Sequence, residues 1–252
     1  MVDARFASLL FNLASEDRLA LLASISLESQ TLTGLSKEIN ASRPECSRHL
    51  ARLKETGLIF KDADGYYHIT SVGGAILKLL PSIHFLLKER KSLDTHDLSA
   101  LPITFVERIG DLSKAEPVQH FSRAANLVTT LSSGASNFLW GMGNEPLGPV
   151  YNFAREFLSR TVSLRLITGQ KVDGSDFRRL YPDLPGKFEL ATLEDVKVGI
   201  SINESLAWVT FPLPDGRIDY SAGFYGTDPR FREWSTDLFE YFWAKSTKIV
   251  IR

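Results

Sequence analysis

The stretch Ser42–Ile59 reads SRPECSRHLARLKETGLI, and it decides the fold of the N-terminal part of the chain. Ser42 and Glu45 have the S-x-x-E spacing of a capping box, and Pro44 is tolerated in a first helical turn. Gly57 is typical of the residue just past a helix end. The sequence therefore predicts a capped helix from Ser42 to about Thr56. Three apolar residues recur at i, i+4 and i+7 and should form its buried stripe: Cys46, Leu50 and Leu53.

The opposite face of this helix carries small and cationic side chains. Four cations and one anion lie between Arg43 and Lys54, and a local cationic face is what phosphate binding needs. Arg48 stands at the centre of the face, where arginine can pair bidentately with guanine in the major groove. The simpler alternative is a solvated helix face. The candidate DNA-contacting residues of the helix are Arg43, Pro44, Ser47, Arg48, Ala51, Arg52 and Lys54.

The segments around this helix complete a winged helix-turn-helix. Residues 16–26 and 32–39 have helical apolar spacing. Residues 58–70 contain two β-prone runs around an Asp-Gly turn, which is a hairpin signature, and residues 71–90 return to helix. The hairpin is the expected wing, and Lys61 and His68 are its candidate DNA contacts. Asp62 and Asp64 offset their charge.

This N-terminal pattern resembles the arsenic-repressor-like winged-helix regulators. The run Ser42–Ile59 is similar to their recognition-helix pattern S-x-x-x-x-S-x-H-L-x-x-L-x-x-x-G-L-[IV], and Thr70-x-x-Gly73 is similar to the T-x-x-G that starts their next helix. The resemblance implies dimeric binding to operator DNA. Metal-sensing members carry a cysteine pair on the recognition helix. Only Cys46 is present here, as part of the buried stripe, so metal control is not carried over.

The rest of the chain resembles an archaeal subgroup, the methanogenesis-regulator-type proteins. The similar segments are HDLSALP at 96–102 and W-x-x-x-LFEYF at 234–242. The resemblance implies a sensor-like domain behind the winged helix. We therefore predict an α+β winged helix domain at 1–91 and an α/β ligand-sensing or dimerisation domain at 102–252.

Alternating helical and extended patterns follow residue 102, which indicates an α/β domain. The order and lengths of its strands resemble the phospholipase-D-like fold of some archaeal sugar-sensing regulators. The catalytic H-x-K-x-x-x-x-D motif of that fold is absent. The expected helices are 105–112, 118–131, 147–159 and 229–245, and the expected strands are 138–142, 162–168, 188–191, 196–202, 206–211 and 219–225.

Composition is that of an ordinary soluble protein, with 44% apolar and 23% charged residues among 252. Residues 1–91 contain 12 Lys and Arg against 10 Asp and Glu, a net charge of +2, whereas the remainder has 17 against 20, a net charge of −3. A single cysteine excludes an internal disulfide and fits a reducing cytoplasm. No apolar stretch is long enough to span a bilayer, and we expect no signal peptide.

No catalytic, phosphate-binding or metal-binding motif is present, so we expect no enzyme activity, no cofactor and no metal site. Gly141-Met142-Gly143 is a fragment of a glycine motif, either a plain loop or part of an anion site. Aromatic walls with a few polar groups are typical of small-molecule pockets. The candidate ligand-binding residues, on or beside predicted strands, are Trp140, Arg165, Tyr220 and Tyr225.

The predicted function is that of a homodimeric, cytoplasmic transcription regulator. Its winged helix reads double-stranded DNA, and its C-terminal domain senses a small metabolite. Two alternatives remain. One is a winged helix that contacts another protein in a nucleic-acid-processing complex, and the other is a C-terminal domain that only dimerises.

Overall fold

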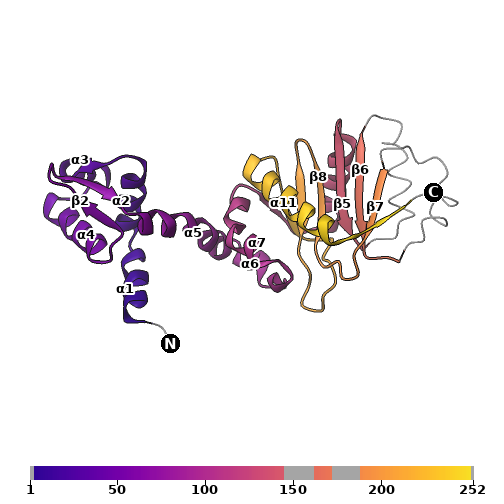
Figure 1. Ribbon diagram of the computed structural model, residues 1–252, viewed down its shortest axis with the longest axis horizontal. Coiled ribbons are helices and arrows are strands. Elements are labelled where there is room, and N and C mark those ends of the chain that lie inside the picture. The colour runs from indigo at the N-terminus through magenta and orange to yellow at the C-terminus, as the bar shows by residue number, and fades with distance from the viewer. Residues whose placement is uncertain (1–2, 145–161, 172–187, 251–252) are drawn as a thin grey trace. The chain divides into compact units, whose positions relative to one another are not determined.

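The computed structural model describes residues 3–144, 162–171 and 188–250. The chain divides into two compact units, residues 1–80 and 81–252 (Figure 1). The boundary falls inside helix α5 (Ser71–Lys88), although the sequence placed the domains at 1–91 and 102–252. The segment 91–102 contributes Leu93 and Leu101 to the core of the second unit.

The first unit is a winged helix. Its elements are α1 (Ala4–Leu13), α2 (Glu16–Leu27), β1 (Gln30–Thr31), α3 (Leu32–Glu38), α4 (Arg43–Glu55), β2 (Ile59–Lys61), β3 (Tyr66–Ile69) and the start of α5. The three strands pair antiparallel in the order β1-β3-β2. This confirms the predicted order of two helices, a capped helix, a hairpin and a further helix. The core includes the predicted stripe of α4, packed with Leu21 and Leu22 of α2 and Leu35 of α3.

Helix α1 was not predicted, although its signals are local. The side chain of Asp3 accepts a hydrogen bond from the N–H of Arg5, which caps the helix. Its C-terminal end packs through Leu9 and Leu13 on the core of the winged helix. Its outer side exposes Phe6, Leu10 and Phe11.

The second unit is a three-layer α/β domain. Among the described residues its sheet has eight strands in the order β11-β7-β6-β5-β8-β9-β10-β4. Strands β5, β6 and β7 are parallel, and the remaining neighbours pair antiparallel. The strands are β4 (Glu116–Val118), β5 (Phe138–Gly143), β6 (Ser163–Thr168), β7 (Phe188–Thr192), β8 (Gly199–Asn203), β9 (Ala207–Thr210), β10 (Gly223–Gly226) and β11 (Thr247–Ile249).

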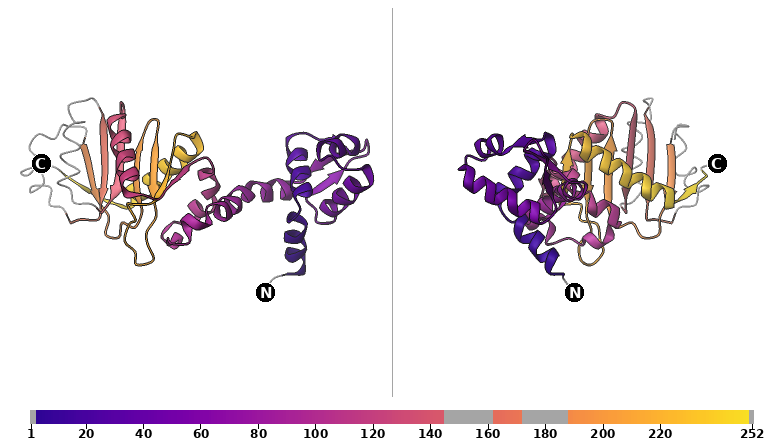
Figure 2. Two further views of the ribbon diagram at one scale, coloured as in Figure 1. Left: turned by 180° about the vertical axis from the view of Figure 1, so that it is seen from behind. Right: turned by 60° about the vertical axis from the view of Figure 1, so that its left-hand side comes forward.

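Two long helices cover the opposite faces of this sheet, as the front and back views show (Figures 1 and 2). Helix α11 (Pro229–Lys245) packs Trp234 and Phe239 on one face, and α8 (Phe121–Ser133) packs Ala124 and Leu131 on the other. Short helices precede them: α6 (Arg90–Leu93), η1 (Leu98–Ala100), α7 (Ile103–Glu107) and η2 (Ile109–Leu112).

Several predicted boundaries in this unit were wrong. Residues 196–198 and 219–222 lie outside β8 and β10, and the predicted helix 118–131 begins only at Phe121 because residues 116–118 form β4. Strands β4 and β11 were missed, since three-residue edge strands leave almost no alternation to read. The predicted helix 147–159 lies outside the described residues.

Helix α5 is long and apolar enough to cross a membrane by length and composition, with 18 residues and a mean hydropathy of 1.2. This is weak evidence, because helices of soluble proteins pass the same test. Four of its apolar side chains are exposed along one stripe: Val72, Leu79, Ile83 and Leu87.

Candidate nucleic-acid interface

Helix α4 is held rigidly by its own sequence. The Ser42 hydroxyl accepts a hydrogen bond from the N–H of Glu45 at 3.4 Å, and Pro44 lies in the first turn. The turn before it contains Asn40 in the left-handed region, at φ 52°. Cys46, Leu50 and Leu53 are fully buried. Because one face is fixed in the core, the opposite face is fixed in the direction of solvent.

The predicted contact residues of α4 are all exposed, but their charges are not equally free. Arg52 pairs with Glu55 at 3.1 Å, and the guanidinium of Arg43 donates to the hydroxyl of Thr33 in α3. Within the described parts of the chain, Arg48 and Lys54 form no ion pair. The cations available to a DNA phosphate or base are therefore Arg48 and Lys54 first. Pro44, Ser47 and Ala51 add a low-relief surface around them.

The wing is less cationic than its composition suggests. His68 lies 2.7 Å from the carboxylate of Asp62, which also accepts the N–H of Tyr66 at 2.8 Å. The hydrogen bond from His68 is the main cause that holds the pKa of Asp62 below its ordinary value. The ammonium of Lys61 lies 5.4 Å from the centre of the Tyr67 ring. Of the two predicted wing contacts, His68 is committed to Asp62 and Lys61 remains exposed.

Sequence reasoning missed two aromatic residues on the wing. Phe60 and Tyr66 are 48% and 42% exposed. The ring of Phe60 stacks on His68 with 5.0 Å between centroids and 18° between planes. The alternation of β2 and β3 could have found them, since Phe60 and Tyr66 occupy the positions that point away from the buried Ile59 and Tyr67.

His49 and Cys46 of α4 point away from the exposed face. The imidazole Nε2 of His49 lies 3.4 Å from the carboxylate of Asp17 in α2, so this side chain faces the neighbouring helix. The thiol of Cys46 is buried, and burial raises its pKa.

The four candidate ligand-binding residues do not line one pocket. Trp140 and Arg165 are neighbours on β5 and β6, with the guanidinium 5.0 Å from the indole ring. Arg165 also forms ion pairs with Glu189 and Glu240, at 2.8 and 2.9 Å, so its charge is already compensated. Trp140 stacks on Phe239 of α11 at 5.2 Å.

Tyr220 and Tyr225 lie elsewhere. The Tyr220 hydroxyl accepts the N–H of Asn144 at 2.7 Å, beyond the end of β5. Tyr225 packs with the α8 face of the sheet, whereas Trp140 packs with the α11 face. A single pocket containing both Trp140 and Tyr225 is therefore excluded, because the sheet separates them. Gly143, of the glycine fragment, is the last residue of β5, and a Cβ there would lie 2.8 Å from the Tyr220 hydroxyl oxygen.

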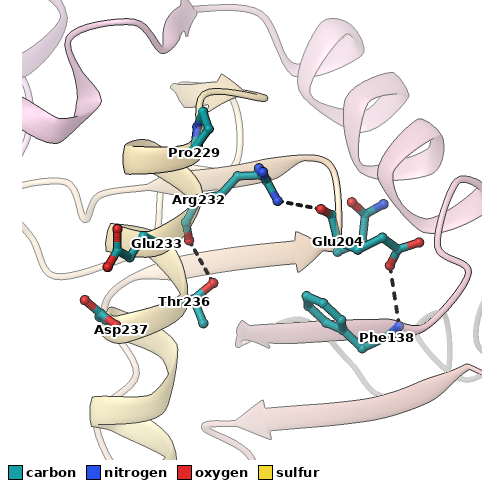
Figure 3. Close-up of a pocket in the computed structure, with 8 residues that line it drawn as sticks. Phe138, Glu204, Pro229, Arg232, Glu233, Thr236 and Asp237 are labelled. Atoms are coloured by element: carbon teal, nitrogen blue, oxygen red, sulfur yellow. Dashed lines mark hydrogen bonds between the residues drawn. The ribbon is translucent and has the colours of Figure 1, made fainter.

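A hollow of about 320 Å³ lies between the start of α11 and the β8–β9 turn (Figure 3). None of the four candidates lines it. The guanidinium of Arg232 is held there by the carbonyl of Glu204, and the carboxylate of Glu204 accepts backbone N–H groups at the start of β5. Its lining residues are Phe138, Asn203, Glu204, Pro229, Arg232, Glu233, Thr236 and Asp237.

Within residues 3–144, 162–171 and 188–250, no group of three or more His, Cys, Asp or Glu residues converges as a metal site would require.

The model of the family described as "Bacterial regulatory protein, arsR family" matches residues 15–61. This segment runs from the cap of α2 to the end of β2 and contains the whole helix-turn-helix. The N-terminal unit therefore carries a helix-turn-helix of the arsR regulatory type. No curated protein matches the chain.

Solved structures show further likenesses. TrmBL2, described as an archaeal chromatin protein, is 13% identical, with a TM-score of 0.40, over 92% of this chain and 93% of its own. NolR from Sinorhizobium fredii is 28% identical, with a TM-score of 0.29, over 31% of this chain and 83% of its own. HlyU from Vibrio cholerae is 28% identical, with a TM-score of 0.28, over 32% and 88%. Because these TM-scores are below 0.5, the assignment depends on the family match and on the geometry of α4.

Proposed function

We propose that the chain is a transcription regulator that reads duplex DNA with α4 in the major groove. The supporting observation is the exposed face of α4, where uncommitted Arg48 and Lys54 stand among small side chains on a capped helix. A helix of this kind fits a groove about 12 Å wide. In this arrangement Arg48 contacts a base edge, whereas Arg52 and Lys54 contact phosphates.

The test begins with selection of a binding site from random duplexes by the full chain. Arg48→Ala should weaken binding to the selected site by about 1–3 kcal/mol and relax specificity at one position. Lys54→Ala should weaken binding to all sequences alike and lower the salt dependence by about 0.9 in the slope of log K against log salt. Arg230→Ala, which removes an exposed arginine of α11, is the matched control and should bind like wild type.

Failure has two forms. If no duplex is enriched, the winged helix serves another partner, and a protein contact becomes the function to test. If a duplex is enriched but Arg48→Ala binds it like wild type, the assigned face of α4 is wrong.

We also propose that the chain acts as a homodimer. The support is the apolar stripe along α5, whose side chains at 72, 79, 83 and 87 are exposed in the single chain. α1 exposes further apolar side chains, Phe6, Leu10 and Phe11. Two copies would bring two α4 helices to half-sites about 34 Å, or a multiple of this distance, apart on a roughly palindromic operator.

For the C-terminal unit we propose small-molecule sensing without catalysis. The support is that a dimer of winged helices needs no further domain to bind DNA, and that the sequence lacks catalytic motifs. The phospholipase-D-like fold, the archaeal subgroup and the cytoplasmic location stay predictions. In a thermal-shift screen of metabolites on the full chain, a ligand at 100 times its Kd should add about 2.7 kcal/mol of stability. If no compound stabilises the chain, the dimer-platform alternative is favoured.

A further inference from the structure

The wing presents an aromatic face beside the candidate DNA-reading helix. Phe60 lies directly opposite His68 in the β2–β3 register, and Tyr66 stands two residues before His68 in the same strand. Since side chains alternate between the two faces of a hairpin, these three share one face. The opposite face carries Ile59 and Tyr67, which are buried in the core of the winged helix.

The electrostatics of the hairpin argue against ionic contact with DNA. Residues 59–69 contain one lysine against two aspartates, a formal net charge of −1 with histidine neutral. The imidazole of His68 is bound to the carboxylate of Asp62, and Lys61 stands over the Tyr67 ring. A hairpin with this charge gains little from phosphates, whose contacts depend on Lys and Arg.

The aromatic face is also ordered before any partner arrives. The Phe60 ring is stacked on His68, and the bond from His68 to Asp62 holds that imidazole in place. Asp62 in turn accepts the N–H of Tyr66, so it ties both strands of the wing together. Preorganised aromatic side chains lose little conformational entropy on binding.

We propose that the wing contacts DNA through the rings of Phe60 and Tyr66, which pack against the deoxyribose walls of the minor groove. The inference rests on the proposed function. Its support is continuity with α4: the chain passes from Glu55 to Ile59 in one turn, and the N–H of Leu58 donates to the carbonyl of Leu53 at 3.0 Å. Apolar packing releases no counterions, so this contact strengthens binding equally at every salt concentration.

The experiment measures the Kd of the full chain for its selected duplex at several salt concentrations. Phe60→Ala should weaken binding about tenfold at each concentration, with an unchanged salt slope. Phe60→Tyr keeps the ring and should restore most of the affinity. Lys54→Ala should instead lower the slope. Phe121→Ala, at another exposed phenylalanine, is the matched control and should bind like wild type.

Circular dichroism and light scattering of Phe60→Ala complete the test. The variant should keep the wild-type helix content and mass, because the side chain is half exposed. A changed mass would show that Phe60 packs against a second copy, and it would overturn the inference. Wild-type affinity of Phe60→Ala, while Arg48→Ala loses specific binding, would also overturn it and leave the proposed function standing. If no duplex is enriched at all, both fall together.

Discussion

At the scale of single residues, Gly73 explains the T-x-x-G motif. The Thr70 hydroxyl donates to the carbonyl of Gly57 at 2.7 Å and accepts the N–H of Gly73 at 2.9 Å, so it caps α5 against the end of α4. This brings α5 so close that a Cβ on Gly73 would lie 2.2 Å from the carbonyl oxygen of Leu58. The motif therefore joins a cap to a close approach of two backbones.

Gly73→Ala should destabilise the winged helix by about 2–3 kcal/mol, since a backbone carbonyl cannot move aside cheaply. Gly74→Ala is the matched control: nothing lies within 4 Å of its added Cβ, and alanine favours helix by about 0.5–1 kcal/mol. Urea unfolding of the full chain, followed by circular dichroism, measures both. Equal effects of the two substitutions would contradict the packing described for Gly73.

Cys46 gives a second prediction at this scale. Its thiol is fully buried, and burial raises its pKa, so little reactive thiolate forms near neutral pH. The folded chain should resist alkylation by iodoacetamide at pH 7.5, whereas the chain in denaturant should react within minutes. Mass spectrometry of timed samples measures this. Rapid labelling of the folded chain would mean that α4 is not docked on its stripe.

At the scale of elements, Glu204 in the β8–β9 turn holds the start of β5 (Figure 3). Its carboxylate accepts the N–H of Ser136 at 2.6 Å and those of Asn137 and Phe138 at 3.5 Å. Burial alone would raise the pKa of Glu204, but backbone N–H groups outweigh burial and hold it below the usual 4.5. The charged form therefore stabilises the folded state.

Glu204→Gln should lower the stability of the second unit by about 1 kcal/mol at pH 7. Because the folded pKa is depressed, the contribution is present above the unfolded pKa and is lost as pH falls through the folded pKa. The difference from wild type should thus vanish below about pH 4. Unfolding curves between pH 3 and 7 measure it. Glu233→Gln, on the same hollow, is the control, and an equal pH-dependent loss there would contradict the assignment.

At the scale of the whole molecule, the stripe on α5 predicts the assembly. Leu79→Glu combined with Ile83→Glu should convert a dimer to a monomer, because each charge would be buried in an apolar seam. Operator affinity should then fall by about 10²–10⁴ as the second half-site contact is lost. Light scattering and DNA titration measure both effects. Leu27→Glu, at an apolar residue of α2 that is 89% exposed, should leave both unchanged; a monomeric wild type would contradict the seam.

The two units also differ in how far their folds could be predicted. In the first, the sequence predicted nearly every element, because caps, the Asp-Gly turn and i, i+4 spacing act between near neighbours. In the second, the long strands β5 and β6 and the helix α11 were predicted close to their bounds. The edge strands β4 and β11 were not, since each forms only by pairing with a strand far along the chain.

The sequence by itself determined the winged helix, its buried stripe of Cys46, Leu50 and Leu53, and the outward direction of Arg48. Only the tertiary structure decided which charges are free and which side chains meet. Arg43 is engaged by a hydroxyl ten residues away, and Trp140 and Tyr225 are separated by the sheet that carries both. The reason is physical: helix faces follow from a period within one segment, whereas strand order, register and ion pairing follow from contacts between distant segments.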